Sequence, residues 1–135
     1  MFLGDYHYVI DAKNRLFIPA QFREELGERF VMCKSETSPC ISVWTEERFG
    51  EYLEEIKSTM SMTERRYALQ GANTMVLDKM GRVTVNTDLC SYAALTKSIV
   101  VYGVGDGAEI WDEDAFKAEL SRGETEHNAR AVMGK

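Results

Sequence analysis

The chain carries one pattern twice, and this duplication limits its fold more than any other feature. Residues 11–15 (DAKNR) and 78–82 (DKMGR) share the form Asp-x-x-x-Arg at an offset of 67 positions. The same offset brings Trp44 onto Trp111, and the chain has no other tryptophan. Because one offset relates both the Asp-x-x-x-Arg segments and the tryptophans, the chain contains an internal duplication.

The duplication predicts the domain organisation. We expect a first half-repeat at 1–57, a connector at 58–67, a second half-repeat at 68–124 and a flexible C-terminal tail at 125–135. The tail lacks apolar periodicity, which predicts a frayed or disordered end. With 44% hydrophobic and 10% aromatic residues, the 135-residue chain has enough apolar material for a folded core.

Alternating and helical apolar patterns predict an α+β fold, mainly β with short helices, in two tandem βαβ-type repeats. Thr45 and Thr87 are the expected N-caps of two of the helices. The last helix, with Phe116 and Leu120, is expected to be a shorter version of the helix that follows Thr45. Strands are predicted at 5–10, 15–18, 30–34, 41–44, 98–102 and 108–111, and helices at 20–26, after Thr45, near 63–72 and after Thr87.

The two Asp-x-x-x-Arg segments are predicted to be tight turns. Asn14 and Gly81 occupy equivalent positions, and these residue types tolerate a positive φ best. Each Asp carboxylate is placed to bind the turn backbone and to hold the following guanidinium in one direction. An arginine held in this way, beside Lys13 or Lys79, suits a phosphate or a guanine edge. The alternative is an ordinary turn with a surface cation.

Charge is unevenly distributed along the chain. The 16 Lys+Arg and 22 Asp+Glu give a net charge of −6, and an evenly spread negative charge would disfavour nucleic acid. The segments that contain the turns escape this acidity, because 1–34 has a net charge of 0 and 78–100 has +1. The acidity belongs to 35–57, at −4, and 101–125, at −5.

Three other patterns are interpreted as structural. The glycine-rich segment 103–107 (GVGDG) leads into a strand, so it favours a hairpin turn over a dinucleotide loop, which must open a helix. Cys33, Cys40 and His7 lack zinc-site spacing, and Cys33 is expected to be a buried thiol. The glutamates of segment 51–55 favour a solvated helix face. We therefore predict no enzyme activity, metal, cofactor or small-molecule substrate.

The sequence also predicts the compartment. The N-terminus reaches Asp5 without a basic segment followed by an apolar one, and no apolar run approaches the roughly 20 residues of a membrane span. We therefore expect a cytoplasmic protein with free thiols and no membrane partner.

The order of these motifs is similar to that of a known family. The tetrapeptide MFLG at 1–4, the run IDAKNRLFIPA at 10–20 and the tract 99–111 resemble MraZ, and the resemblance extends to about residue 124. It implies two AbrB-like swapped-hairpin modules intertwined into a pseudo-dimeric β-barrel, and units assembled into ring homo-oligomers. It also implies a bacterial, nucleoid-associated transcriptional regulator of the division and cell-wall gene cluster, which binds short direct repeats in its own promoter.

The resemblance further implies which residues contact double-stranded DNA and which orient the turns. Two departures from the family pattern accompany it: Asn86 stands where a proline like Pro19 is common, which predicts a looser entry to the following helix, and Met80 stands at the position of Lys13. The DNA-binding residues are Arg15 and Arg82, with Lys13, Lys79 and Asn14 as weaker assignments, and the orienting residues are Asp11, Asp78 and Gly81.

Assembly would explain how an acidic protein binds DNA. A half-repeat with a net charge near zero supplies few phosphate contacts, whereas a ring on tandem repeats gains affinity through effective concentration. The alternative from another class is an antitoxin-like protein-interaction module, which would need an exposed apolar tail. The short polar tail of this chain disfavours that alternative.

Overall fold

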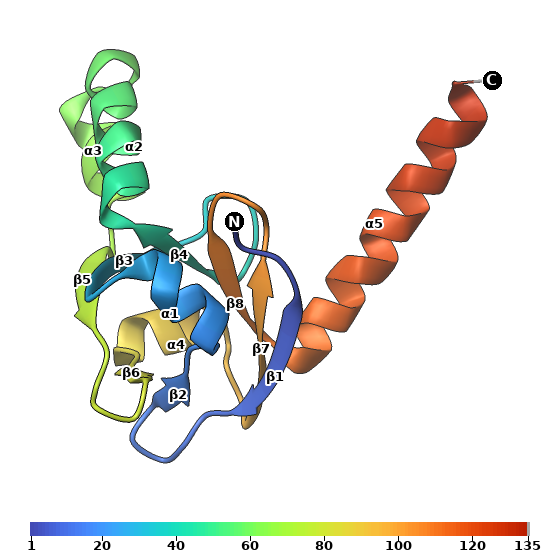
Figure 1. Ribbon diagram of the computed structural model, residues 1–135. Helices are drawn as coiled ribbons and strands as arrows, with labels where there is room; N and C mark the ends of the chain where they lie inside the picture. The colour runs from blue at the N-terminus through green and yellow to red at the C-terminus, as the bar shows by residue number, and fades with distance from the viewer. Residues whose placement is uncertain (135) are drawn as a thin grey trace.

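The computed structural model describes residues 1–134 and has an α+β fold (Figure 1). Most elements lie where they were predicted. The predicted bounds agree with the structure to within one residue at each end for α1, β3, β4, β7 and β8. In chain order the elements are β1 (Asp5–Val9), β2 (Arg15–Phe17), α1 (Ala20–Leu26), β3 (Arg29–Lys34), β4 (Ile41–Thr45), α2 (Glu46–Thr59), α3 (Met62–Ala68), β5 (Asn73–Val76), β6 (Arg82–Thr84), α4 (Thr87–Tyr92), β7 (Ser98–Gly103), β8 (Ala108–Asp112) and α5 (Glu113–Met133).

Strand exchange between the two copies organises the main sheet. Its order is β1-β7-β8-β4-β3-β5, with antiparallel pairing throughout. The first strand of each copy pairs with the third strand of the other, β1 with β7 and β5 with β3. This exchange relates the two halves of the sheet by a pseudo-twofold between β4 and β8 and confirms the intertwined swapped-hairpin fold.

The second strands of the copies form a sheet of their own. β2 pairs antiparallel with β6, and Leu16 lies opposite Val83. The strand after the first turn therefore does not return beside β1, as its position in the sequence suggested, but crosses to the other copy. Within the described residues, hydrogen bonding divides the strands between these two sheets, and no single closed barrel is formed.

Both faces of the main sheet are covered, which explains why its central strands are almost wholly apolar. In β7, Ile99 and Val101 join the main core, whereas Val100 packs with the cluster under α5. In β3, Phe30 and Met32 face the main core in the same way, whereas Val31 and Cys33 pack with the cluster under α2. The main core fills the space between the main sheet, the β2–β6 sheet, α1 and α4.

The helix termini show one correction. The side-chain oxygen of Asn86 accepts the backbone N–H of Leu89 at 2.8 Å, so Asn86 is the N-cap of α4 and Thr87 is its first residue. The prediction of a Thr87 cap was wrong, because asparagine, at the position equivalent to Pro19, is itself a good cap. The looser entry to this helix stays a prediction. Thr45 caps α2 as predicted, through the N–H of Arg48 at 3.0 Å.

The second correction concerns the C-terminal segment. The predicted frayed or disordered tail is wrong as far as Met133, because α5 continues to that residue and is longer than α2. Segment 121–134 is exposed throughout, so the outer half of α5 continues the helix without burying a face against the rest of the described chain. Figure 1 shows the α2–α3 pair at the end of the molecule opposite β2 and β6, and α5 leaving the body beside β1 and pointing away from it.

Candidate functional site

Both Asp-x-x-x-Arg segments form the same turn, held by the aspartate side chain. Oδ1 of Asp11 accepts the backbone N–H groups two and four residues later, at 2.9 and 2.8 Å, and Oδ2 accepts Nε–H of Arg15 at 2.7 Å. Asp78 makes the same three contacts, each at 2.9 Å, with Arg82 as the side-chain partner. The predicted link between carboxylate, turn backbone and guanidinium is therefore present in both copies.

The hydrogen bonds keep both carboxylates charged. The backbone N–H of Arg15 is the main cause that holds the pKa of Asp11 below its usual range, and the Arg15 side chain adds to it. The backbone N–H and side chain of Arg82 lower the pKa of Asp78 in the same way. Each guanidinium is thus paired with a fixed negative charge at neutral pH.

The left-handed residues lock each turn to the opposite copy. Asn14 and Gly81 have φ values of 59° and 83°, as predicted. The carbonyl of Gly81 accepts the N–H of Ile18 at 3.1 Å, and the carbonyl of Asn14 accepts the N–H of Val85 at 2.8 Å. Because each bond joins one copy to the other, both turns are attached to the opposite copy.

The pairing of β2 with β6 places both arginines on one face. Side chains alternate along a strand, and the central residues Leu16 and Val83 are 0% and 1% exposed in the core. Their neighbours therefore point to the opposite, outer face. This outer face consists of Arg15, Phe17, Arg82 and Thr84.

The two guanidinium groups are accessible. The side chains of Arg15 and Arg82 are 32% and 21% exposed, and each ion pair uses Nε. Within residues 1–134 the two terminal amino groups of each guanidinium make no hydrogen bond. A fork that is fixed at its base and open at its end suits bidentate binding of an acceptor.

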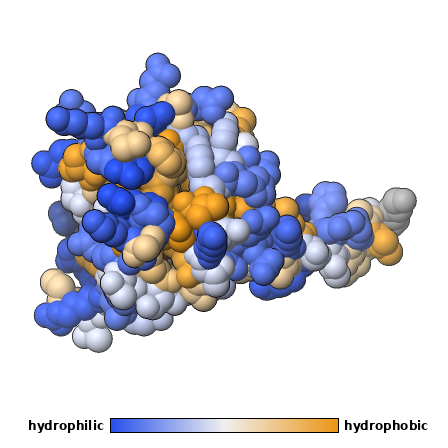
Figure 2. Space-filling view, turned by 90° about the horizontal axis from the view of Figure 1, so that it is seen from below, coloured by the Kyte–Doolittle hydropathy of each residue, from blue (hydrophilic) through white to orange (hydrophobic). Residues whose placement is uncertain are grey.

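We call the exposed surface of segments 11–17 and 78–84 the paired-turn surface. The two segments contain all eight predicted site residues, of which only Gly81 is buried. Lys13 and Lys79 are exposed in this surface. Figure 2 views the molecule from this end and shows an apolar patch among hydrophilic groups. Phe17 and Met80 are exposed apolar residues of the two segments, at 39% and 60%. The surface therefore combines fixed cations with apolar contact area.

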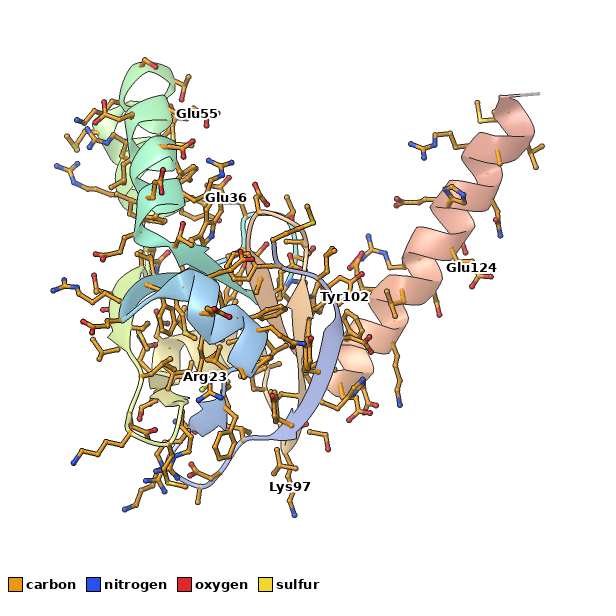
Figure 3. The ribbon with its side chains drawn as sticks, viewed as in Figure 1. Arg23, Glu36, Glu55, Lys97, Tyr102 and Glu124 are labelled. Atoms are coloured by element: carbon orange, nitrogen blue, oxygen red, sulfur yellow. The ribbon has the colours of Figure 1, made fainter. Side chains whose placement is uncertain are left out.

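Figure 3 labels charged side chains at both ends of the molecule. Lys97 lies at the end with the turns, whereas Glu55 of α2 and Glu124 of α5 lie on the projecting helices. The global charge of −6 thus coexists with turn-bearing segments that are close to neutral, at 0 for 1–34 and +1 for 78–100.

Sequence reasoning missed two cations of this end. Figure 3 places Arg23 below α1, on the side of β2 and β6. Lys97 lies beside the first turn, because its carbonyl accepts the N–H of Ile10 at 3.0 Å. The repeat offset gave no signal for either residue, since their equivalents in the other copy are Cys90 and Phe30.

The remaining candidates are structural. Segment 103–107 connects β7 to β8 as the predicted hairpin, with Val104 N–H donating to the Gly107 carbonyl at 2.9 Å. Cys33 is buried as predicted, and burial raises the pKa of its thiol to about 11. Among residues 1–134 no cluster of three His, Cys, Asp or Glu side chains is arranged to hold a metal ion. No helix within this range has the length and apolar character needed to cross a membrane.

Known proteins match both repeats and most of the chain. A family model described as "MraZ protein, putative antitoxin-like" matches twice, over residues 1–70 and 68–133. A protein of Leuconostoc mesenteroides named "Transcriptional regulator MraZ" is 40% identical over 124 residues, covering 87% of this chain and 85% of the relative.

Relatives of the same name occur in other bacteria. That of Clostridium acetobutylicum is 37% identical and covers 97% of this chain and 94% of its own length. That of an Arthrobacter species is 38% identical over 93% of this chain and 91% of the relative. Two successive matches to one family model and relatives that align over almost the full length show that this chain belongs to the MraZ family.

Proposed function

We propose that this chain is a DNA-binding transcriptional regulator that contacts double-stranded DNA through the paired-turn surface. The observation that carries the proposal is the placement of Arg15 and Arg82 on one outer face, each fixed at Nε and open at its terminal amino groups. The relatives' name, transcriptional regulator, supports the same class of function. Neither their name nor the site geometry calls for catalysis.

Each site residue has a role in this proposal. Arg15 and Arg82 bind base edges or phosphates, since a guanidinium fork matches both. Lys13 and Lys79 bind the phosphate backbone as mobile charges, and Asn14 lies at the same surface. Asp11, Asp78 and Gly81 orient the turns.

The target and the assembly follow from the family resemblance. We propose that the units form rings, that each unit occupies one short repeat, and that tandem direct repeats upstream of the chain's own gene bind one ring. Regulation then acts on the division and cell-wall gene cluster, in the cytoplasm at the nucleoid. Simultaneous contacts raise affinity by about 10²–10⁴ without any new contact, which suits a unit with few phosphate-binding cations.

A fluorescence anisotropy titration tests the proposal. Labelled DNA from upstream of this chain's gene is compared with a scrambled duplex of equal length and composition. Arg15→Ala is expected to abolish specific binding without changing the oligomer size in light scattering. Arg66→Ala, which removes an exposed arginine on α3, is the matched control and should bind normally. Unchanged binding by Arg15→Ala would remove Arg15 from the site.

The salt dependence of the same titration tests the role of assembly. A dissociated single unit is expected to bind one repeat weakly and to lose affinity steeply as salt increases. A tight complex of one unit with one repeat at physiological salt would contradict the need for a ring. Stable binding of a protein ligand with no DNA binding would instead favour the antitoxin-like module.

A further inference from the structure

Arg23 makes a contact that only one copy contains. A Cβ atom built on Gly81 would overlap Nη1 of Arg23 and would lie 2.7 Å from its Cζ. The guanidinium of the first copy therefore lies directly against the backbone of the second turn. No ion pair within residues 1–134 engages Arg23, so an acidic partner does not explain its position.

The turn that Arg23 contacts is more buried at its left-handed residue than the other turn. Gly81 is buried, whereas the equivalent Asn14 is only partly buried. The residue equivalent to Arg23 is Cys90, whose side chain ends at a sulfur that donates to the Val85 carbonyl at 3.8 Å. A cysteine is too short to cover a neighbouring turn as an arginine does.

The same comparison explains the residue at each left-handed position. Both turns need a positive φ, and asparagine meets this need at φ 59° in the first turn. In the second turn the Arg23 side chain occupies the space of a Cβ, so only glycine fits without displacing the guanidinium. The residue at each left-handed position thus agrees with the opposite copy: asparagine stands in the turn opposite the short Cys90, and glycine stands in the turn that Arg23 contacts.

Arg23 lies on the turn side of α1 (Figure 3), near Tyr8 of β1. Its charge acts on Tyr8 of β1, where burial raises the pKa of the phenol and Arg23 opposes that increase. The residue equivalent to Tyr8 in the second copy is Met75. The arrangement of tyrosine, arginine and turn backbone therefore occurs on one side of the pseudo-twofold.

We propose that Arg23 is a positioning residue that holds the 78–82 turn rigid, whereas Cys90 leaves the 11–15 turn free to adjust. Resting on the proposed function, this inference makes the two halves of the paired-turn surface unequal. A symmetric pair of turns would contact the two halves of a box alike, so it would bind an inverted repeat in either orientation. A rigid and an adjustable turn bind one box in a single orientation, which suits repeats that all point the same way.

Hydrogen exchange of the free protein tests the positioning without DNA. The Gly81 and Asn14 amides donate to the equivalent Asp78 and Asp11 carbonyls at the same distance, 3.0 Å. We expect greater protection at Gly81 than at Asn14 after correction for intrinsic rates. Arg23→Ala should accelerate exchange at position 81 by about tenfold or more, and leave position 14 unchanged.

Cys90→Ala is the matched control, and it should leave both turns as they are. A second variant moves the contact to the other copy. Cys90→Arg alone is not sufficient, because the new arginine would meet the side chain of Asn14. Only Cys90→Arg combined with Asn14→Gly should slow exchange at position 14. Unchanged exchange at position 81 in Arg23→Ala would overturn the positioning role.

Binding to a single box tests the orientation. Base pairs are substituted in one half of the box and then in the other, and the wild type should tolerate changes in one half better. Arg23→Ala should weaken binding about 3- to 30-fold and reduce the difference between the halves, and Cys90→Ala should do neither. Faster exchange at position 81 with an unchanged difference between halves would overturn the orientation claim. Absence of any specific DNA binding by the wild type would instead contradict the proposed function, whereas the hydrogen-exchange result would still test the positioning role of Arg23.

Discussion

The first and second copies have the same turn in different surroundings. The Nε–Oδ2 distance is 2.7 Å between Arg15 and Asp11 and 2.9 Å between Arg82 and Asp78. Around these turns the side chains differ, with Phe17 where the second copy has Thr84. The two copies thus keep the hydrogen bonds of the turn itself and differ in the side chains around it.

The largest expected difference between the copies lies in the core. Phe22 of α1 and Leu89 of α4 are equivalent and are 1% and 0% exposed. Phe22 also contacts the rings of Phe2 and Tyr6 edge to face, each with centroids 5.3 Å apart. Phe22→Ala should therefore lower the free energy of unfolding by about 3–5 kcal/mol, measured by urea denaturation.

Leu89→Ala is the matched variant, and it should cost less because it removes no aromatic contacts. Both variants should leave a single cooperative transition, since the two helices cover one shared core. Two separate transitions would contradict an intertwined unit and would mean that the copies fold independently.

Local chemistry made much of this fold predictable. Alternating apolar residues gave the strands, and the left-handed requirement at Asn14 and Gly81 followed from residue type alone. The tie between Asp11 and Arg15 was predictable because all its partners lie within five residues. These features depend on residues that are close together in the sequence, so residue type and spacing are sufficient to predict them.

What the sequence did not show depends on contacts between distant segments. The equivalence of the copies indicates a duplication, but the pairing of β2 with β6 required the family resemblance. Arg23 gave no signal because its contact, Gly81, lies in the other copy. The extent of α5 was missed because apolar periodicity detects buried helix faces, and segment 121–134 buries none.

A smaller difference between the copies is expected at the tryptophans. Nε1 of Trp111 donates to Glu109 at 3.0 Å, whereas Nε1 of Trp44 is buried and lacks a partner within residues 1–134. Trp111→Phe loses a hydrogen bond, but Trp44→Phe removes an unsatisfied donor. Trp44→Phe should therefore cost about 1 kcal/mol less in unfolding free energy than Trp111→Phe. An equal cost would indicate that Trp44 finds a partner in solution.

Acid should affect the two turns alike. The pKa values of Asp11 and Asp78 are lower in the folded protein than in the unfolded chain. Their contribution to stability is therefore complete above the unfolded value, about 4, and is lost as the pH falls through the folded values. Carboxyl NMR titration should give both midpoints below the usual range. A normal midpoint for one of them would mean that its turn opens in solution.

The smallest expected effect concerns the end of α5, which differs from α2 at one decisive position. Phe49 and Ile56 anchor α2, and both are buried. Their equivalents in α5 are Phe116, which is buried, and Gly123, which offers no side chain. The helix is therefore attached at its first turn only, and its outer half makes no packing contribution to its own unit.

Removal of residues 125–135 should consequently change the unfolding free energy of a single unit by less than about 0.5 kcal/mol. Ile56→Ala in α2 is the contrasting variant and should cost about 2–5 kcal/mol. Both measurements use urea denaturation at a concentration where light scattering shows single units. A clear loss of stability on truncation would mean that the outer half of α5 packs against the body in solution, and that Gly123 does not end the anchored part of the helix.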